Sequence, residues 1–238
     1  MAKLTTPLAP ITVASIYNNG PLPTRMAKCT PDTAAALQNV IADLRPLGFD
    51  LRLSDLFRSY DMQKEAHEDY VQGRKKAFSP APGGSMHEAG RAMDIDLASM
   101  GVPLKRFWEI AAARGFFPII DTPDTSRSEA WHFDCRGSHD FVYQYVKSGK
   151  AGHSMAPYTQ MAQSAIVAIG VQVDQVPDQD IAFQQAALIR LGFDPGRIDG
   201  IIGDRTRGAL RDAGVDQGDA ISLLSEKLKE KFPLEFGQ

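Results

Sequence analysis

The chain has 238 residues, a length that allows one large domain or two modest ones, each able to bury a core. Hydrophobic residues make up 43% and charged residues 23%, so the composition does not support disorder or a fibrous repeat. The formal net charge of −3 provides no broad basic field for nucleic acid or anionic lipid. The longest apolar stretch, residues 161–171, is far shorter than the ~20 residues of a membrane-spanning helix. We therefore expect a folded protein with no nucleic-acid partner and no membrane span.

Helical and strand patterns alternate through the first part of the chain. Thr30 followed by Pro31 is typical of a helix start, and Ser138 is expected to cap the last helix of this part. In chain order the patterns predict a helix over 30–44, a strand over 49–53, a helix over 62–72, a strand over 91–98, a helix over 103–114, strands at 116–120 and 130–135, and a helix after 138.

The strand pattern at 91–98 has two different faces. Alternation places Met93 and Ile95 on one face and Asp94 on the other, so one face suits a core and the other suits chemistry. Short strands mixed with helices in this order predict an α+β domain with a small, largely antiparallel sheet. We expect this domain to cover residues 1–150.

A second domain is expected at the C-terminus. Residues 151–179 are rich in Gly, Ser, Pro and Gln around one weak helical pattern, which predicts a linker with a docking helix. Residues 180–238 contain three helical patterns, the first ending at Gly192. About sixty residues are enough for a small three-helix bundle domain.

Metal-binding side chains gather in two segments. His87 and Asp94 lie in GGSMHEAGRAMDID, and His132 lies in SEAWHFD. A catalytic zinc site has three protein ligands and leaves a fourth position for water. Two imidazoles and one carboxylate meet that count, so the sequence predicts one Zn²⁺ per chain, although cobalt or nickel could substitute in vitro.

Glu129 is the candidate general base. A metal ion lowers the pKa of bound water, and a nearby glutamate can then take the proton. Glu129 precedes His132 by three residues, and residues three apart in a regular strand face opposite sides. A bend at residues 128–130 is therefore needed to bring Glu129 round to the metal.

Further polar residues flank the metal ligands. Arg58 is expected to hold a substrate carboxylate or carbonyl through its fork of donors, and Ser85 to hydrogen-bond the same ligand. Gly90 is expected at a close backbone approach or an unusual dihedral. Glu88 and Arg91 are expected to form a solvated pair.

The two cysteines, Cys29 and Cys135, are too few for a disulfide-built scaffold and lack the short spacing of a zinc knot. The sequence leaves open whether they are free thiols or one bridge. Residues 1–20 contain no uninterrupted apolar segment, so we predict no signal peptide there. No extra apolar stripe is visible on the helices, which predicts a monomer.

Three segments resemble a known family. Residues 85–94 resemble the S-x-H-x-x-G-x-A-x-D signature of zinc D-alanyl-D-alanine carboxypeptidases and dipeptidases, a group that includes vancomycin-resistance D,D-peptidases and phage L-alanyl-D-glutamate endopeptidases. Residues 129–132 resemble their E-x-W-H element, and residues 57–63 resemble their R-S-Y-x-x-Q segment. The resemblance covers roughly residues 30–148. It implies zinc held by His87, Asp94 and His132, catalysis by Glu129 with Arg58, and substrate contacts from Arg58 and Ser85.

Residues 180–232 resemble the three-helix peptidoglycan-binding domain found on many wall hydrolases. The residues that carry this resemblance are Gln185, Leu188, Leu191, Gly192, Phe193, Pro195, Gly196, Asp199, Gly200, Gly203 and Thr206. The chain departs from the pattern at Asp204, where proline is usual, and at Ala213-Gly214, where Phe-Gln is common. The departures weaken the expectation of tight wall binding more than the expectation of the fold.

The two resemblances imply zinc-dependent hydrolysis of an amide bond in the peptide stem of bacterial peptidoglycan. A D-alanyl-D-alanine carboxypeptidase is expected first, and an L-alanyl-D-glutamate endopeptidase is the alternative. A catalytically inactive wall-binding protein is the alternative of another class, and the presence of Glu129 argues against it. The expected place of action is the cell wall, periplasmic or extracellular, with an unknown export route or a phage-lysis route.

Overall fold

The computed structural model describes residues 5–17, 19–152, 155–215 and 217–238. Their contacts group into two compact units. The N-terminal unit comprises Leu8–Ala81 and Met86–Gly137. The C-terminal unit comprises Pro82–Ser85 and Ser138–Gln238, together with residues 5–7.

An antiparallel sheet forms the centre of the N-terminal unit. Within the described residues it has four strands, which in sheet order are β3 Leu53–Asp55, β4 Ala92–Ile95, β6 His132–Cys135 and β5 Phe116–Pro118. A separate pair is formed by β1 Ala9–Pro10 and β2 Lys28–Cys29. In the two central strands Asp94 lies directly opposite His132. The small, largely antiparallel sheet predicted from the sequence is confirmed.

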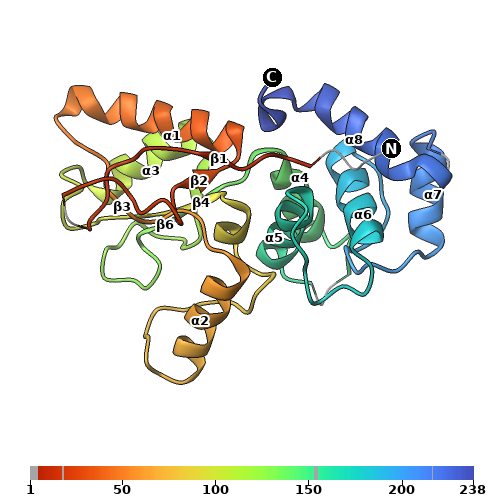
Figure 1. Cartoon of the computed structure of the whole chain (residues 1–238), viewed down its shortest axis with the longest axis horizontal. Helices are drawn as coiled ribbons and strands as arrows, with labels where there is room; N and C mark the ends of the chain where they lie inside the picture. Colours follow the sequence, from red (N-terminus) through yellow and green to blue (C-terminus); the bar gives the residue numbers. More distant parts are fainter. Residues whose placement is uncertain (1–4, 18, 153–154, 216) are drawn as a thin grey trace. The chain divides into compact units, whose positions relative to one another are not determined.

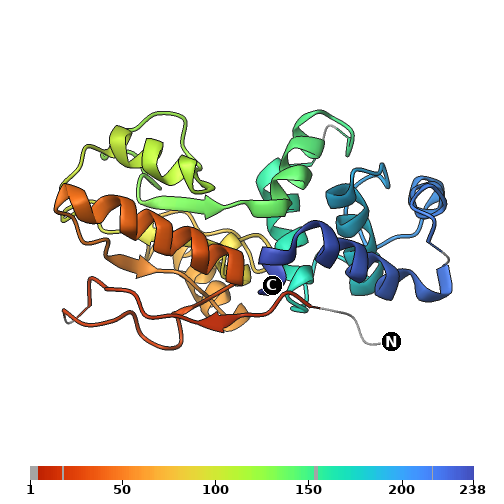
Figure 2. The ribbon, with the colours of Figure 1, turned by 90° about the horizontal axis from the view of Figure 1, so that it is seen from above.

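Helices cover the apolar face of this sheet. The α-helices described in the unit are α1 Pro31–Leu44, α2 Tyr60–Val71 and α3 Leu104–Ala113. Figure 1 shows α1 and α3 on one side of the strands and α2 on the other, and Figure 2 shows α1 and α3 from above. Leu37 of α1 and Phe107 of α3 pack with Met93 and Phe133 of the central strands in one buried cluster. Because side chains alternate along a strand, Asp94 and His132 then point to the opposite face.

One predicted helix cap and one predicted strand boundary differ from those observed. Helix α1 begins at Pro31 as predicted, but the Thr30 hydroxyl donates to Asp32 and does not accept from a helical N–H group. Strand β3 begins at Leu53, later than the predicted 49–53. The reason is its partner: Leu53 pairs with Ile95, the last residue of β4, so residues 49–52 lie beyond the end of that strand.

The C-terminal unit is helical. Its described α-helices are α4 Asp140–Lys147, α5 Pro157–Ala168, α6 Gln179–Leu191, α7 Asp204–Asp212 and α8 Ala220–Lys231. The chain also has short 3-10 helices at Arg45–Leu47, Met86–Ala89, Gly137–His139, Gln217–Asp219 and Pro233–Phe236. The three helices predicted after residue 180 are α6, α7 and α8, and Gly192 ends α6 with φ +103°. None of the described helices is long and apolar enough to cross a membrane.

Ser138 does not cap α4, which corrects the sequence prediction. It lies within the 3-10 helix Gly137–His139, and His139 occupies the N-cap position. The Ser138 hydroxyl instead donates to Glu235 Oε2 at 2.6 Å and accepts from Arg190 Nε at 2.9 Å. The Ser138 hydroxyl therefore hydrogen-bonds to the buried ion pair between Arg190 and Glu235, and it is not available to cap the helix.

The compact units and the predicted domains divide the chain differently. Helix α5, expected as a docking helix in a linker, is buried along Gln160–Ala168 and packs against α4 and α6 within the C-terminal unit. That unit begins at Ser138, whereas the predicted boundaries are residues 150 and 179. Compact packing is a different property from independent folding, so domains at 1–150, 151–179 and 180–238 stay a prediction.

Candidate metal centre

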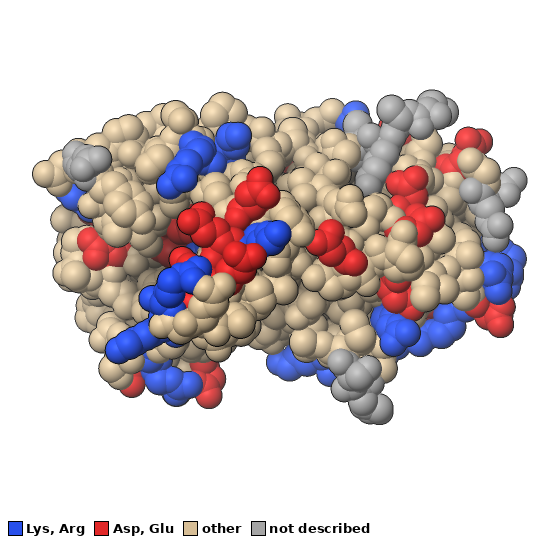
Figure 3. Space-filling view, turned by 60° about the horizontal axis from the view of Figure 1, so that its bottom comes forward, with Lys and Arg blue, Asp and Glu red and all other residues tan. Residues whose placement is uncertain are grey.

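Three potential ligand atoms converge on the face of the sheet opposite α1 and α3. His87 lies in the 3-10 helix Met86–Ala89, Asp94 in β4 and His132 in β6, and all three are buried. His87 Nε2 lies 3.2 Å from Asp94 Oδ1 and 3.2 Å from His132 Nδ1, and His132 Nδ1 lies 2.9 Å from Asp94 Oδ1. Figure 3, which turns the underside of Figure 1 forward, shows acidic and basic side chains next to one another on both the left and the right of this face.

The spacing of these atoms fits a zinc ion. Tetrahedral zinc with bonds of about 2.0–2.1 Å holds its ligand atoms roughly 3.4 Å apart, close to the observed separations. The outward nitrogens are already engaged, because His87 Nδ1 lies 3.0 Å from Leu56 O and His132 Nε2 lies 2.9 Å from Asp134 Oδ1. When His87 Nδ1 and His132 Nε2 carry the protons, His87 Nε2, His132 Nδ1 and the Asp94 carboxylate face one another with lone pairs only. A cation placed between these three groups would accept all of these lone pairs.

The charges around the triad favour a cation. Burial disfavours the charged form of His132, but the carboxylates of Asp134 and Asp94 outweigh burial and raise its pKa to about 10. Burial likewise raises the pKa of Asp94, but His87 and His132 more than compensate and hold it well below its ordinary value. The site therefore stabilises positive charge at its centre, either protons on the imidazoles or a metal ion in their place.

Glu129 lies in a bend immediately before β6. Its φ of +68° is left-handed, and its carbonyl accepts a 3.0 Å hydrogen bond from the His132 N–H. This is the bend expected at residues 128–130, because residues three apart in a regular strand would face opposite sides. Burial raises the pKa of the Glu129 carboxyl, His132 lowers it and Asp94 raises it, so the carboxyl lies within the electrostatic range of both ligands.

Arg58 is fixed beside the triad. Its Nε donates to Asp55 Oδ2 at 2.5 Å, its Nη1 to Gln63 Oε1 at 3.2 Å and its Nη2 to Asp94 Oδ2 at 3.3 Å. Ser59, the next residue, caps α2 by accepting from the Met62 N–H, which fixes the backbone at this point. Burial opposes the charge of Arg58, but the two aspartates outweigh it and raise its pKa, so the guanidinium remains a cation.

The structure places the other sequence-predicted residues as follows. Ser85 is buried within the C-terminal unit, and its role in substrate binding stays a prediction. Gly90 has φ +62°, and a Cβ there would come 2.9 Å from Cys29 Cα, so both reasons expected for a glycine are present. Glu88 and Arg91 are buried, which contradicts the expected solvated pair, because Arg91 is ion-paired with Asp32.

Two functional neighbours were missed by the sequence reasoning. Asp134 contacts the outward nitrogen of His132, and Asp55 orients Arg58. The period-two pattern of the strand could have found Asp134, since it lies two residues after His132 and therefore on the same face. No local signal identifies Asp55, because its role depends on how the chain turns before α2.

Cys29 and Cys135 are free thiols in this structure, and both are buried. Burial raises the pKa of Cys29 to about 12 and that of Cys135 to about 11. The thiolate, which is the reactive form, is therefore scarce at neutral pH. Neither cysteine belongs to the group of metal-binding side chains at His87.

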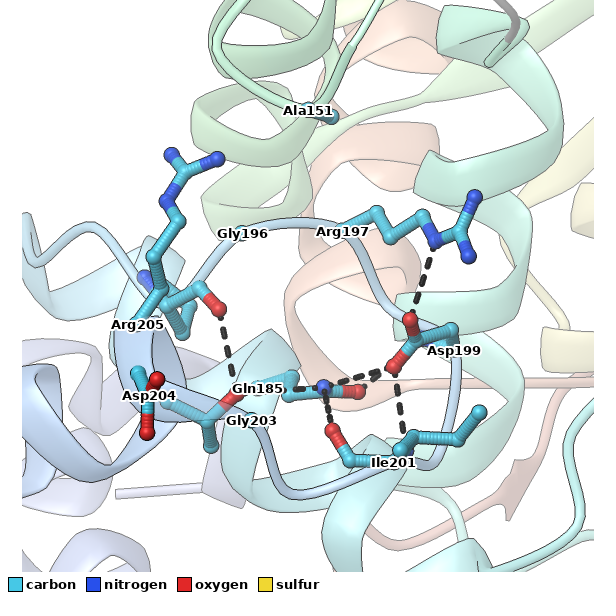
Figure 4. A pocket seen from close by; sticks show the side chains of 11 residues that line it. Ala151, Gln185, Gly196, Arg197, Asp199, Ile201, Gly203, Asp204 and Arg205 are labelled. Carbon is cyan, nitrogen blue, oxygen red and sulfur yellow. Dashed lines mark hydrogen bonds and ion pairs between the residues drawn. The ribbon is translucent and has the colours of Figure 1, made fainter.

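A cavity of about 400 Å³ lies in the C-terminal unit, at the loop between α6 and α7 (Figure 4). The Gln185 side chain fixes this loop, accepting from the Asp199 N–H and donating to Asp199 Oδ1. The charges on its wall are paired, because Arg197 contacts Asp199 and Arg205 contacts Asp194. These ion pairs leave little net charge on the wall of the cavity.

Buried imidazole and carboxylate side chains with the spacing of metal ligands lie beside a fixed arginine, an arrangement that is typical of metal-dependent hydrolases. The family comparison is more specific. Residues 26–157, more than half of the chain, match the VanY family of D-alanyl-D-alanine carboxypeptidases, and the chain belongs to this family.

Solved structures that match part of the chain carry related descriptions. The LdcB LD-carboxypeptidase, described in connection with peptidoglycan recognition, is 23% identical with a TM-score of 0.43, and the match covers 53% of this chain and 66% of LdcB, just under two thirds. A zinc complex of the vancomycin-resistance D,D-pentapeptidase VanY is 18% identical with a TM-score of 0.40, covering 56% of this chain and 80% of VanY. The L,D-carboxypeptidase DacB of Streptococcus pneumoniae is 20% identical with a TM-score of 0.36, and the match covers 54% of this chain and 84% of DacB. No curated protein matches the chain.

Proposed function

We propose that this protein is a zinc-dependent peptidase that releases the terminal D-alanine from peptidoglycan stem peptides. The observation that carries the proposal is the convergence of His87, Asp94 and His132 at the spacing of a zinc site. Membership of the VanY family supplies the reaction class. The expected place of action is the cell wall, where this substrate lies.

The residues around the triad supply complementary roles. When bound, zinc lowers the pKa of a water molecule and polarises the substrate carbonyl. Glu129 takes the proton of the attacking water and delivers it to the leaving amine, because its half-buried carboxyl lies within the electrostatic range of His132 and Asp94. Arg58 holds the carbonyl oxygen or the terminal carboxylate of the substrate, and Ser85 is proposed to hydrogen-bond the same ligand.

The fixed guanidinium of Arg58 suits a substrate with a free carboxylate next to the scissile bond. Asp55 and Gln63 hold Arg58 in place before any substrate arrives, so binding does not have to order this side chain. A peptide ending in D-Ala-D-Ala has a free carboxylate next to the scissile bond, which a rigid, permanently charged fork matches. The γ-linked D-glutamate of the stem also has a free α-carboxylate beside the L-alanyl-D-glutamate bond, so Arg58 suits either reaction and the products decide between them.

Metal removal tests the proposal. Purified pentapeptide stems are incubated with the protein and the products are identified by mass spectrometry. We expect release of one D-alanine per stem, loss of the activity with a chelator, and recovery with added zinc. A cut between L-alanine and glutamate would assign the endopeptidase reaction instead. No product from zinc-loaded protein would contradict hydrolysis and favour the inactive wall-binding protein.

We further propose that the C-terminal unit attaches the enzyme to the wall through the cavity between α6 and α7. Attachment raises the local concentration of stem peptides without adding catalytic contacts. Ile201 lines the cavity and is 58% exposed, so it is available to a ligand.

Sedimentation with insoluble peptidoglycan tests this attachment. In a Glu129→Gln background, which protects the wall from cleavage, we expect Ile201→Asp to lower the bound fraction several-fold. The matched control is Leu234→Asp, which changes an equally apolar exposed residue of the same unit outside the cavity. Equal binding by both variants and the parent would refute the role of the cavity.

A further inference from the structure

One carboxylate of the N-terminal unit stands directly behind a proposed metal ligand. His132 and Asp134 lie two residues apart in β6 and so share one face of the strand. Asp134 Oδ1 lies 2.9 Å from His132 Nε2, the nitrogen turned away from Asp94 and His87. Asp134 is only 3% exposed, so its carboxylate is held away from water.

The surroundings of Asp134 leave it dependent on His132. Its cross-strand neighbours are Ala92 on β4 and Phe117 on β5, neither of which brings a charge or a side-chain donor. Among the described residues, the side chain that hydrogen-bonds its carboxylate is that of His132. Burying a carboxylate costs free energy unless it is paired, so a buried aspartate at this position calls for an explanation beyond packing.

We propose that Asp134 is a positioning residue that orients His132 as a metal ligand; this inference rests on the metal centre of the proposed function. By accepting the Nε2–H, the carboxylate selects the imidazole tautomer whose lone pair is on Nδ1. It also fixes the rotation of the ring, so that Nδ1 faces Asp94 and His87 at 2.9 and 3.2 Å. Partners of this kind behind a metal-binding histidine strengthen metal affinity 10- to 100-fold.

The two histidines differ in how they are held. His87 Nδ1 donates to a backbone carbonyl, Leu56 O, at 3.0 Å, which side-chain substitution cannot remove. His132 depends on a side chain, so its orientation is accessible to mutation. The contribution of this outer contact to metal binding can therefore be measured at His132 alone, with His87 unchanged.

Zinc affinity, measured by competition with a chromophoric chelator at constant pH, tests the proposal without using activity. We expect Asp134→Leu to weaken zinc binding about 10- to 100-fold. Asp134→Asn keeps an acceptor oxygen, so its loss is expected to be smaller. The matched control is Asp96→Asn, a nearby carboxylate that accepts from Ala98 N and Ser99 Oγ, and it leaves the affinity unchanged.

A spectroscopic readout separates positioning from general damage to the fold. In the zinc-loaded protein, imidazole ¹⁵N shifts are expected to show His132 protonated on Nε2, and this signature is expected to weaken in Asp134→Asn. That variant decides the question if Asp134→Leu fails to fold. Unchanged zinc affinity and unchanged His132 shifts in Asp134→Asn, with the same affinity in any folded Asp134→Leu, would overturn the proposal.

The test also distinguishes this inference from the proposed function. A protein that binds zinc, loses affinity on Asp134 substitution and yet cleaves no stem peptide would refute the peptidase proposal and leave the role of Asp134 standing. A protein that cleaves stem peptides but keeps its zinc affinity when Asp134 is replaced would support the peptidase proposal and refute the role of Asp134. Absence of zinc binding in the parent protein would overturn both.

Discussion

Replacing Glu129 by glutamine is expected to lower kcat/KM for stem-peptide hydrolysis by about 10²–10⁴-fold while zinc stays bound. Glutamine has nearly the same shape but cannot take a proton from water at neutral pH. Zinc retention is expected because the proposed ligands are His87, Asp94 and His132, and Glu129 lies in the turn before them. Steady-state kinetics and metal content, both measured on the same preparation, check the two halves of the prediction.

The backbone at Glu129 provides a control. Glu129→Ala and Glu129→Gly both remove the carboxylate, so both are expected to be inactive. At φ +68° glycine is unstrained and alanine is not, so the glycine variant is expected to have the higher free energy of unfolding, by about 1 kcal/mol. Substantial hydrolysis by any of the three variants would show that another group removes the proton.

Local patterns were sufficient to predict the elements that present the ligands. Alternation at residues 92–95 placed Met93 in the core and Asp94 on the opposite face, as observed. The same alternation of side chains predicts a bend before His132, and Glu129 has a left-handed backbone conformation there. These features depend on neighbours in sequence, since φ/ψ preferences and side-chain alternation act over a few residues.

Features set by distant partners were not predictable. Ser138 was expected at a helix cap, but Glu235, far along the chain, takes its hydroxyl. The strand at 49–53 was expected to be longer, but its length is set by where β4 ends. Arg91 is expected from the sequence to form a solvated pair with Glu88, but its actual partner, Asp32, is distant in sequence. In each case tertiary packing decided between states that local preferences left nearly equal in free energy.

Arg91 joins three segments of the N-terminal unit. Its side chain has no exposed surface, its Nη2 lies 2.5 Å from Asp32 Oδ2, and its Nη1 donates to Thr30 Oγ1 at 2.8 Å. Its Nε donates to the Cys135 carbonyl at 3.1 Å. The start of α1, the start of β4 and the end of β6 are therefore tied together through one guanidinium, beside the strands that carry Asp94 and His132.

Replacing Arg91 by methionine is expected to lower the free energy of unfolding by about 3–5 kcal/mol, because it leaves the Asp32 carboxylate without its buried partner. Arg91→Lys keeps the charge but loses the fork, so it is expected to be destabilised less. The double variant Arg91→Met with Asp32→Asn is expected to lose less than the sum of the single changes, since the unpaired charge is then absent. Urea unfolding of the zinc-loaded variants measures all four values. A loss below about 1 kcal/mol in Arg91→Met would mean that the pair contributes no more than an exposed salt bridge. In that case packing of the apolar core alone would hold β4 and β6 in register.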